Sequence, residues 1–206
     1  GNVLPDDHCA ADCTAATASC GDGTVQGNEA CDDGNEDDSD NCRSDCTLPS
    51  CGDGVVHVGV EECDGTPKCN EECVRDRFVF VTHDTFSGDF KQQSGMSGIS
   101  VADSLCRARA FASGLHTGSR FLAWMSDETT SPAQRFFRSP GRYVLPDSTV
   151  IASSWDDLVD GTLAEPINLT EELDTPLGSF VWSNTSPDGT RLTDETCENW
   201  TTDSFE

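Results

Sequence analysis

The side chains best suited to chemistry are carboxylates that lie between two cysteines near the N-terminus. Residues 32–41 read DDGNEDDSDN, and all but the glycine carry an oxygen-bearing side chain. Asp33, Asn35 and Asp37 follow the 1, 3, 5 spacing that wraps a turn around calcium. Asp40 adds another carboxylate, and crowded carboxylates repel one another unless a cation lies between them. We therefore expect a structural Ca²⁺ ion here, with a flexible acidic loop as the alternative.

This loop does not follow the EF-hand pattern. An EF-hand needs Gly at the sixth position and Glu at the twelfth, where this loop has Asp38 and Ser44, and no helical pattern flanks it. Residues 37–42, with the pattern DxxDNC, resemble instead the calcium-rich repeats of thrombospondin type 3. That resemblance implies calcium binding in a loop pinned by disulfides.

Three more acids are weaker candidates for calcium. Asp22 and Asp53 each stand inside a Gly-Asp-Gly triplet, and Asp64 lies between a cysteine and a glycine. The same triplets could form tight turns, with glycines at positive φ and an Asp that bonds nearby amides. Both interpretations stay open for Asp22 and Asp53. An ion near Asp64 would have fewer ligands, because the second copy lacks the acidic run.

The cysteines around these acids form an internal repeat. The motif CGDG begins at Cys20 and again at Cys51, and each copy continues with three more cysteines. Such density in a polar segment is typical of a disulfide scaffold from an oxidising compartment, and the CxxC and His ligands of a zinc protein are absent. The connectivity stays open. The cysteines expected in disulfides are Cys9, Cys13, Cys20, Cys31, Cys42, Cys46, Cys51, Cys63, Cys69, Cys73, Cys106 and Cys197.

The charge balance argues against several partners. With 38 acidic and 12 basic residues the net charge is −26, so nucleic acid and anionic membrane surfaces would repel the chain. No apolar run is long enough for a membrane span, and no signal peptide is present, so we expect a mature form or a fragment. No HExxH, GxSxG, phosphate-loop or CxxC motif occurs, and we expect no enzymatic activity.

We expect four segments, and in the last of them interleaved strands and helices predict an α+β domain. The segments are residues 1–19 (the remnant of a preceding repeat), 20–50 (a full repeat), 51–76 (a shorter repeat) and 77–206 (a separate domain). Within the last segment the pattern predicts strands at 78–82, 120–125 and 180–182, helices at 100–114, 131–137 and 155–158, and a hairpin over 143–152.

Two stretches resemble known families. Residues 9–73 resemble the myxobacterial-type cysteine-rich repeat, CGDGxxxxGEECDDGNxxxxDGCSxxC, in their Gly and Asp positions as well as their cysteines. This implies an extracellular spacer or stalk module without enzymatic activity. Residues 78–200, with GMSGISVADSLCRARAFASGL, RFLAWMSD and FVWSNTSPDGTRLTDETCENW, resemble the endostatin domain of collagens XV and XVIII. This implies a C-type lectin-like fold, and bacterial relatives commonly carry it on cysteine-rich stalks.

The second resemblance has limits. The acidic domain lacks the arginine clusters of that family, so we expect no heparin binding. Asp147 matches a zinc ligand of the family, but Phe78 stands where a histidine is needed, so we expect no zinc there. His83 and His116 are expected to be surface or loop histidines without companion ligands.

Cys106 and Cys197 indicate whether the C-terminal domain has all of its strands. In the endostatin family the cysteines that match Cys106 and Cys197 pair with later cysteines, which this chain lacks. We therefore expect the domain to lack its C-terminal strand, which a second chain or self-assembly would supply. Without those partners the two cysteines could pair with each other, stay free or bond to another chain.

We expect a secreted or cell-surface protein, of bacterial origin, that is not an enzyme. It would be a binding or adhesion protein with a stalk stiffened by disulfides and calcium and a C-type lectin-like, endostatin-like head. Its partner would be a protein or glycan at the extracellular surface. The alternative is a structural protomer of an extracellular fibre or surface layer, and a secreted hydrolase is a distant third.

Overall fold

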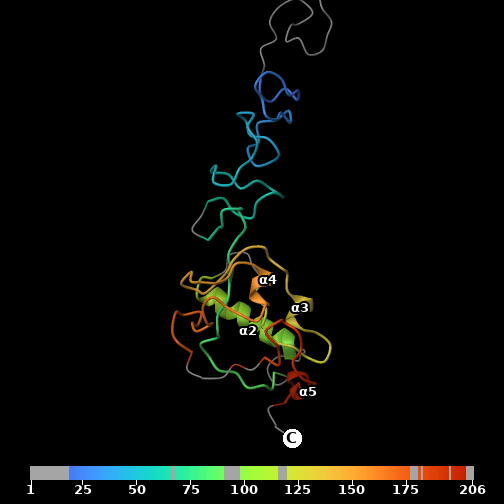
Figure 1. Cartoon of the computed structure of the whole chain (residues 1–206), viewed down its shortest axis with the longest axis vertical. Helices are drawn as coiled ribbons and strands as arrows, with labels where there is room; N and C mark the ends of the chain where they lie inside the picture. The colour runs from blue at the N-terminus through green and yellow to red at the C-terminus, as the bar shows by residue number, and fades with distance from the viewer. Residues whose placement is uncertain are drawn as a thin grey trace, which may run out of the picture. The chain divides into compact units, whose positions relative to one another are not determined.

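The computed structural model describes residues 19–65, 68–90, 98–115, 120–176, 181, 183–194 and 196–202, of which Cys197 is described by its backbone. The chain separates into two compact units, Gly1–Arg75 and Asp76–Glu206 (Figure 1). Cys9, Cys13 and His116 lie outside the described residues, as do two of the three residues of the strand expected at 180–182. Within the described ranges, no helix has the length and apolarity required to cross a bilayer.

The first unit has no apolar core in the ordinary sense. Its described residues form no helix and no strand of the sheet, and every apolar residue that they bury is a cysteine: Cys42, Cys46, Cys63 and Cys73. Larger apolar side chains face solvent instead, among them Val58, which is 76% exposed. Apolar burial therefore contributes little to the stability of this unit, and disulfide bonds must contribute most of it.

Both repeats have the same nested disulfide connectivity. In each repeat the first cysteine pairs with the fourth, and the second pairs with the third inside that loop. The pairs are Cys20–Cys46, Cys31–Cys42, Cys51–Cys73 and Cys63–Cys69. The expected disulfide scaffold is confirmed for these cysteines. Such a set of bridges is typical of proteins from an oxidising, extracellular compartment.

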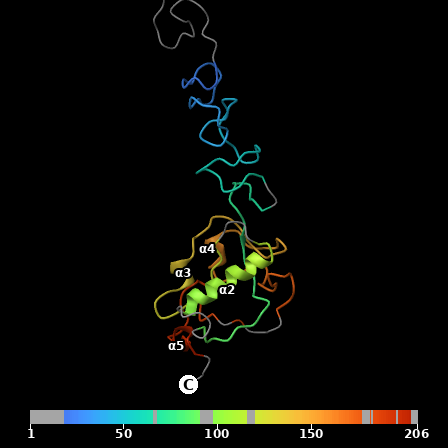
Figure 2. The same cartoon turned by 180° about the vertical axis from the view of Figure 1, so that it is seen from behind.

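The second unit is a small mixed α/β domain around a three-stranded sheet with the order β1-β2-β3. Strand β1 runs parallel to β2, and β2 runs antiparallel to β3, which confirms the hairpin over residues 143–152. The elements, seen from opposite sides in Figures 1 and 2, are β1 (Arg77–Phe78), α2 (Gly98–Ala112), α3 (Pro132–Arg135), β2 (Tyr143–Val144), β3 (Val150–Ala152), α4 (Trp155–Leu158) and α5 (Cys197–Trp200).

Two apolar clusters form the core of the second unit. One lies around α2 and α5, and the other lies around the hairpin and α4. The buried residues of the first are Phe90, Ile99, Val101, Ala102, Ala123, Met125 and Trp200. Those of the second are Tyr143, Leu145, Ile151, Ala152 and Trp155.

Helix α2 begins at Gly98, two residues before the start predicted at residue 100. A Cβ on Gly98 would lie 2.5 Å from the Cβ of Trp200 and would also press on the Asn199 carbonyl oxygen. Only glycine lets α5 approach the start of α2 this closely. The same approach places Trp200 in the core, where its indole N–H donates to the Ser126 carbonyl at 3.0 Å.

The strand predicted at 120–125 is absent, so that prediction is wrong. The amide of Met125 donates back to the Ala123 carbonyl at 2.9 Å, which bends the chain. The guanidinium of Arg135 then donates to both the Ala123 and Met125 carbonyls at 3.4 Å. The Asp103 carboxylate of α2 holds that guanidinium with bonds of 2.5 and 2.6 Å. The Arg135 side chain therefore occupies the carbonyl acceptors that a neighbouring strand would need for pairing.

Strand β1 is shorter than the predicted 78–82 strand because the chain changes its partner. The amide of Val79 still donates to the Val144 carbonyl at 2.8 Å, but the amide of Val81 donates to Leu169 at 3.0 Å. Val81 also forms an isolated parallel bridge with Thr170. This change of partner brings residues 81–84 beside the loop that follows residue 169.

Candidate functional site

The acidic loop of the first repeat is closed by the Cys31–Cys42 disulfide, which brings its two ends together. Within it the Asp33 and Asp40 carboxylates approach one another, and this contact raises the pKa of Asp33. The Asn35 amide donates to Asp40 Oδ2 at 2.9 Å, and this bond lowers the pKa of Asp40. Three of the four ligands predicted in this loop therefore lie together.

Asp37, the fourth predicted ligand, closes the next turn. Its Oδ1 accepts the Ser39 amide at 2.9 Å and the Ser39 hydroxyl at 2.7 Å. Its own amide donates to Asn35 Oδ1 at 2.6 Å. In this conformation the side-chain oxygens of Asp37 and Asn35 therefore serve the loop's own amides, and Asp33 and Asp40 form the carboxylate pair that a cation would bridge.

The Gly-Asp-Gly triplets adopt the tight-turn geometry that was one of the two interpretations. In the first repeat Asp22 accepts the Thr24 amide at 3.0 Å, and in the second Asp53 accepts the Val55 amide at 3.1 Å. The glycines beside both acids have positive φ, for example 89° at Gly21. Each acid also bonds the side chain four residues further on, which is Gln26 in the first repeat and His57 in the second.

Asp64 and its counterpart Asp32 fasten these turns to the rest of each repeat. Asp64 accepts the amides of Gly52 and Gly54, the latter at 2.7 Å. Asp32 likewise accepts the Gly23 amide at 2.9 Å. Its partial burial opposes ionisation, but the amide donors prevail and lower the pKa of Asp32. Asp32 was not among the predicted ligands, although the repeated Cys-Asp pair was a signal for it.

A second carboxylate lies beside each of these acids. The oxygens of Glu29 and Asp32, and those of Glu61 and Asp64, come within 4.8 Å of each other and of a cysteine sulfur. Those sulfurs belong to disulfides, so they are not thiolate ligands. Each repeat therefore presents the same pair of carboxylates at the same place.

The two repeats meet at a buried charged junction. His57 is completely buried, and its Nε2 lies 3.0 Å from Asp53 Oδ2. Arg43 of the first repeat lies 3.9 Å from the same carboxylate, and the Val58 amide donates to the Ser39 carbonyl across the junction at 2.8 Å. The pKa of Asp53 is lowered to about 2, mainly by the hydrogen bond from the Ser50 amide and further by His57. Burial alone would lower the pKa of His57, but Asp53 outweighs it and raises that pKa.

Three residues singled out in the sequence lie in the second unit. Asp147 accepts the Thr149 amide at 2.9 Å in the hairpin turn. Cys106 is a half-buried thiol that forms no disulfide among the described residues, and burial raises its pKa to about 11, so it is a poor nucleophile. For His83, the expectation that it lacks companion ligands is wrong, because two carboxylates lie within reach of its ring.

Comparisons with known proteins concern a limited part of the chain. A family model described as a domain of unknown function (DUF4215) matches residues 7–47, which supports the cysteine-rich repeat. Among curated proteins, the acetylcholinesterase collagenic tail peptide of Torpedo marmorata is 49% identical over 51 residues. That match covers 24% of this chain and 11% of the relative, so it spans about a tenth of the relative's length.

Proposed function

We propose that this protein is a non-enzymatic binding protein of the extracellular space or cell surface. The repeats would act as a stiff spacer, and the second unit would bind a protein or glycan partner. The observation that carries this proposal is the repetition of one nested disulfide pattern, with the same amide-bound carboxylate, in two consecutive repeats. The match to a tail peptide also fits a connecting role better than a catalytic one.

Calcium would stiffen the first repeat. The residues that would hold it are Asp33 and Asp40, whose carboxylates already approach one another. The Asn35 amide group, which donates to Asp40, would orient that carboxylate. The side-chain hydrogen bond between Asp33 and Asp40 raises the pKa of Asp33. A divalent cation would neutralise both carboxylates, which the loop's own amides do not. The carboxylate pairs Glu29–Asp32 and Glu61–Asp64 would attract further cations to the same face of each repeat.

The second unit would be an endostatin-like domain with a C-type lectin-like fold, and the protein would be of bacterial origin. The supporting features are a mixed sheet, the long helix α2 and the close contact of α2 with the CENW segment at α5. The turn over residues 186–189 of the PDG motif also forms, with Gly189 N–H donating to Ser186 at 2.9 Å. A partner for so acidic a protein would be neutral or basic.

A second candidate function is a structural protomer of an extracellular fibre or surface layer. Three valines alternate along one short segment of the second repeat and face solvent: Val56, Val58 and Val60 are 43%, 76% and 65% exposed. These exposed apolar side chains fit contact with another copy of the chain, because contiguous exposed apolar patches commonly mark interfaces.

Sedimentation velocity of the full chain in calcium and in chelator separates these functions. A monomer in both conditions, with a more compact frictional profile in calcium, supports the spacer-and-head protein. Ordered assembly that Val58→Asp abolishes supports the protomer instead.

A calcium-binding variant and a control complete this test. The double variant Asp33→Asn/Asp40→Asn is expected to lose the calcium-dependent change, whereas Asp160→Asn in the second unit should keep it. A wild-type chain that binds no calcium by isothermal titration would refute the calcium part of the proposal.

A further inference from the structure

Two segments that are far apart in sequence lie side by side in the second unit. The bridge between Val81 and Thr170 sets the register, and the Val81 amide donates to the Leu169 carbonyl at 3.0 Å. Two residues further on, the His83 amide donates to Glu171 Oε2 at 2.9 Å. The ring of His83 is therefore held next to the acidic loop at residues 171–174.

That loop is a tight turn built on one buried threonine. Thr170 is fully buried, and its hydroxyl accepts the amides of Glu172 at 3.3 Å and Asp174 at 3.1 Å. Its own amide donates to the Asp174 carbonyl at 2.8 Å, and Leu173 takes a positive φ of 67° to close the turn. The backbone under both acids is thus fixed, while their carboxylates stay exposed to solvent.

The side chains of His83, Glu172 and Asp174 converge. Each offers one ligand atom, and these atoms lie within 4.8 Å of one another. Ligands about 2.1 Å from a tetrahedral zinc ion lie roughly 3.4 Å apart, so a small rotation of the two exposed carboxylates completes the geometry. Among the described residues this is the one such group with an imidazole, and none of its members belongs to a disulfide.

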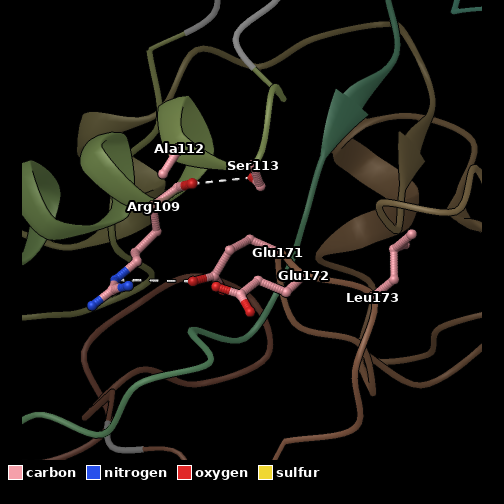
Figure 3. A pocket seen from close by; sticks show the side chains of 6 residues that line it. All are labelled: Arg109, Ala112, Ser113, Glu171, Glu172 and Leu173. Carbon is pink, nitrogen blue, oxygen red and sulfur yellow. Dashed lines mark hydrogen bonds and ion pairs between the residues drawn. The ribbon is translucent and has the colours of Figure 1, made fainter.

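A buried carboxylate beside the group points to a ligand. Glu171 is 4% exposed, and its Oε1 has no hydrogen-bond donor in the described structure. It lines a cavity of about 300 Å³ together with Glu172 and Arg109 (Figure 3). The Arg109 guanidinium lies 4.0 Å from Oε1 and pairs more closely with Asp84. An unsatisfied buried oxygen is costly, and a water molecule bound to a metal ion would supply the missing donor.

The charge around the group also favours a cation. Asp84, Glu171, Glu172 and Asp174 supply four carboxylates against the one guanidinium of Arg109. The donor set selects among cations, because imidazole suits zinc and related transition metals, whereas Ca²⁺ takes six or more oxygen ligands.

We propose that His83, Glu172 and Asp174 bind one zinc ion, with Glu171 accepting a hydrogen bond from a water molecule on the metal. This site is separate from the acidic loop of the first repeat and from Asp147, the residue that matched a zinc ligand of the resembled family. It would clamp residues 81–84 onto the loop at residues 170–174. Its existence does not depend on the calcium or binding proposals above.

Isothermal titration of zinc into the metal-free full chain tests the site. Wild-type protein is expected to bind one zinc ion per chain. His83→Gln and Asp174→Asn should each weaken binding by more than about 100-fold, and Glu171→Gln by about 10-fold, because it removes a hydrogen bond outside the ligand sphere. Glu165→Gln, an exposed acid outside the group, is the matched control and should leave zinc affinity unchanged.

Cobalt absorption provides a second readout that does not depend on affinity. Bound Co²⁺ should give the visible bands of nitrogen and oxygen ligands without a thiolate charge-transfer band, and Cys106→Ser should not alter them. Far-UV circular dichroism of each variant confirms that the fold is retained. Equal zinc affinity in wild type and His83→Gln, or a thiolate band that disappears in Cys106→Ser, would overturn the proposal.

Discussion

The two units reach stability by opposite means. Among the described residues up to Arg75, the buried apolar residues are cysteines, while several valines and Leu48 face solvent. From Asp76 onward two clusters of aromatic and aliphatic side chains form a core. A polar segment of this length cannot bury enough apolar surface to fold alone, so disulfides replace the core by limiting the unfolded chain. No disulfide is formed among the described side chains of the second unit.

The largest expected effect comes from removing the central aromatic side chain of the second unit. Trp155 is 3% exposed, and its ring lies 5.9 Å from that of Trp124 and 6.1 Å from that of Phe136. Trp155→Ala should lower the unfolding free energy of this unit by about 3–5 kcal/mol, as measured by urea denaturation followed by tryptophan fluorescence.

A control variant and a check on the first unit show whether the loss of stability in Trp155→Ala is confined to the second unit. Val181→Ala, at a position that is 68% exposed, should change the same free energy by less than about 0.5 kcal/mol. The four disulfides of the first unit should remain intact and resistant to alkylation in Trp155→Ala. Loss of first-unit protection in this variant would show that the two units do not have separate sources of stability.

The next largest effects rank the disulfides of the first unit. Cys20 and Cys46 are 26 residues apart, whereas Cys63 and Cys69 are 6 apart. In the loop-entropy model, replacing the first pair by serines costs about 3.5 kcal/mol and replacing the second pair about 2.2 kcal/mol. Amide hydrogen exchange of the first unit, measured by mass spectrometry, should show this order. The reverse order would mean that local strain, and not loop closure, decides the contribution.

A smaller effect distinguishes the two repeats by pH. His57 and Gln26 occupy equivalent places and bond Asp53 and Asp22, respectively. The raised pKa of His57 means that its stabilising contribution is complete below about pH 6.5 and is lost as pH rises through the folded-state pKa. Asp53, with its pKa lowered to about 2, loses its contribution as pH falls from about 3.8 towards 2.

The variant His57→Gln gives the second repeat the side chain of the first. It should abolish the loss of amide protection at Val58 between pH 6 and 9, once intrinsic exchange rates are corrected, and leave the loss at low pH in place. The reciprocal Gln26→His should introduce a weaker dependence, because Asp22 is exposed whereas the Asp53 side chain is 7% exposed. An unchanged pH profile in His57→Gln would refute the role of this junction.

Local patterns predicted much of this fold from the sequence. The cysteine density, the hairpin at residues 143–152 and the short helix α4 follow from nearby residues, such as the Pro-Asp pair between the two strands of the hairpin. The strand predicted at 120–125 failed because Arg135, ten or more residues away, takes its carbonyls. The apolar run at residues 121–125 cannot reveal such a side-chain competitor.

The sites show the same division between local and distant information. The contact of Asp33 with Asp40 lies within one short loop, and the acidic run pointed to it. By contrast, His83 lies 88 residues from Glu171, which directly precedes its companion Glu172. A bridge at Val81 that no local motif predicts brings the two segments together. Cysteine pairing was also undetermined, because many connectivities fit one spacing.

The central claim is that the first unit is held by disulfides and the second by its apolar core. All four tryptophans lie beyond residue 76, so tryptophan fluorescence reports the second unit alone. The direct measurement is to reduce and alkylate the full chain in chelator, and then to record fluorescence and proteolytic cleavage together. We predict rapid cleavage within residues 20–75 with an unchanged emission spectrum. A first unit that stays resistant to protease after its disulfides are reduced and alkylated in chelator would contradict the account.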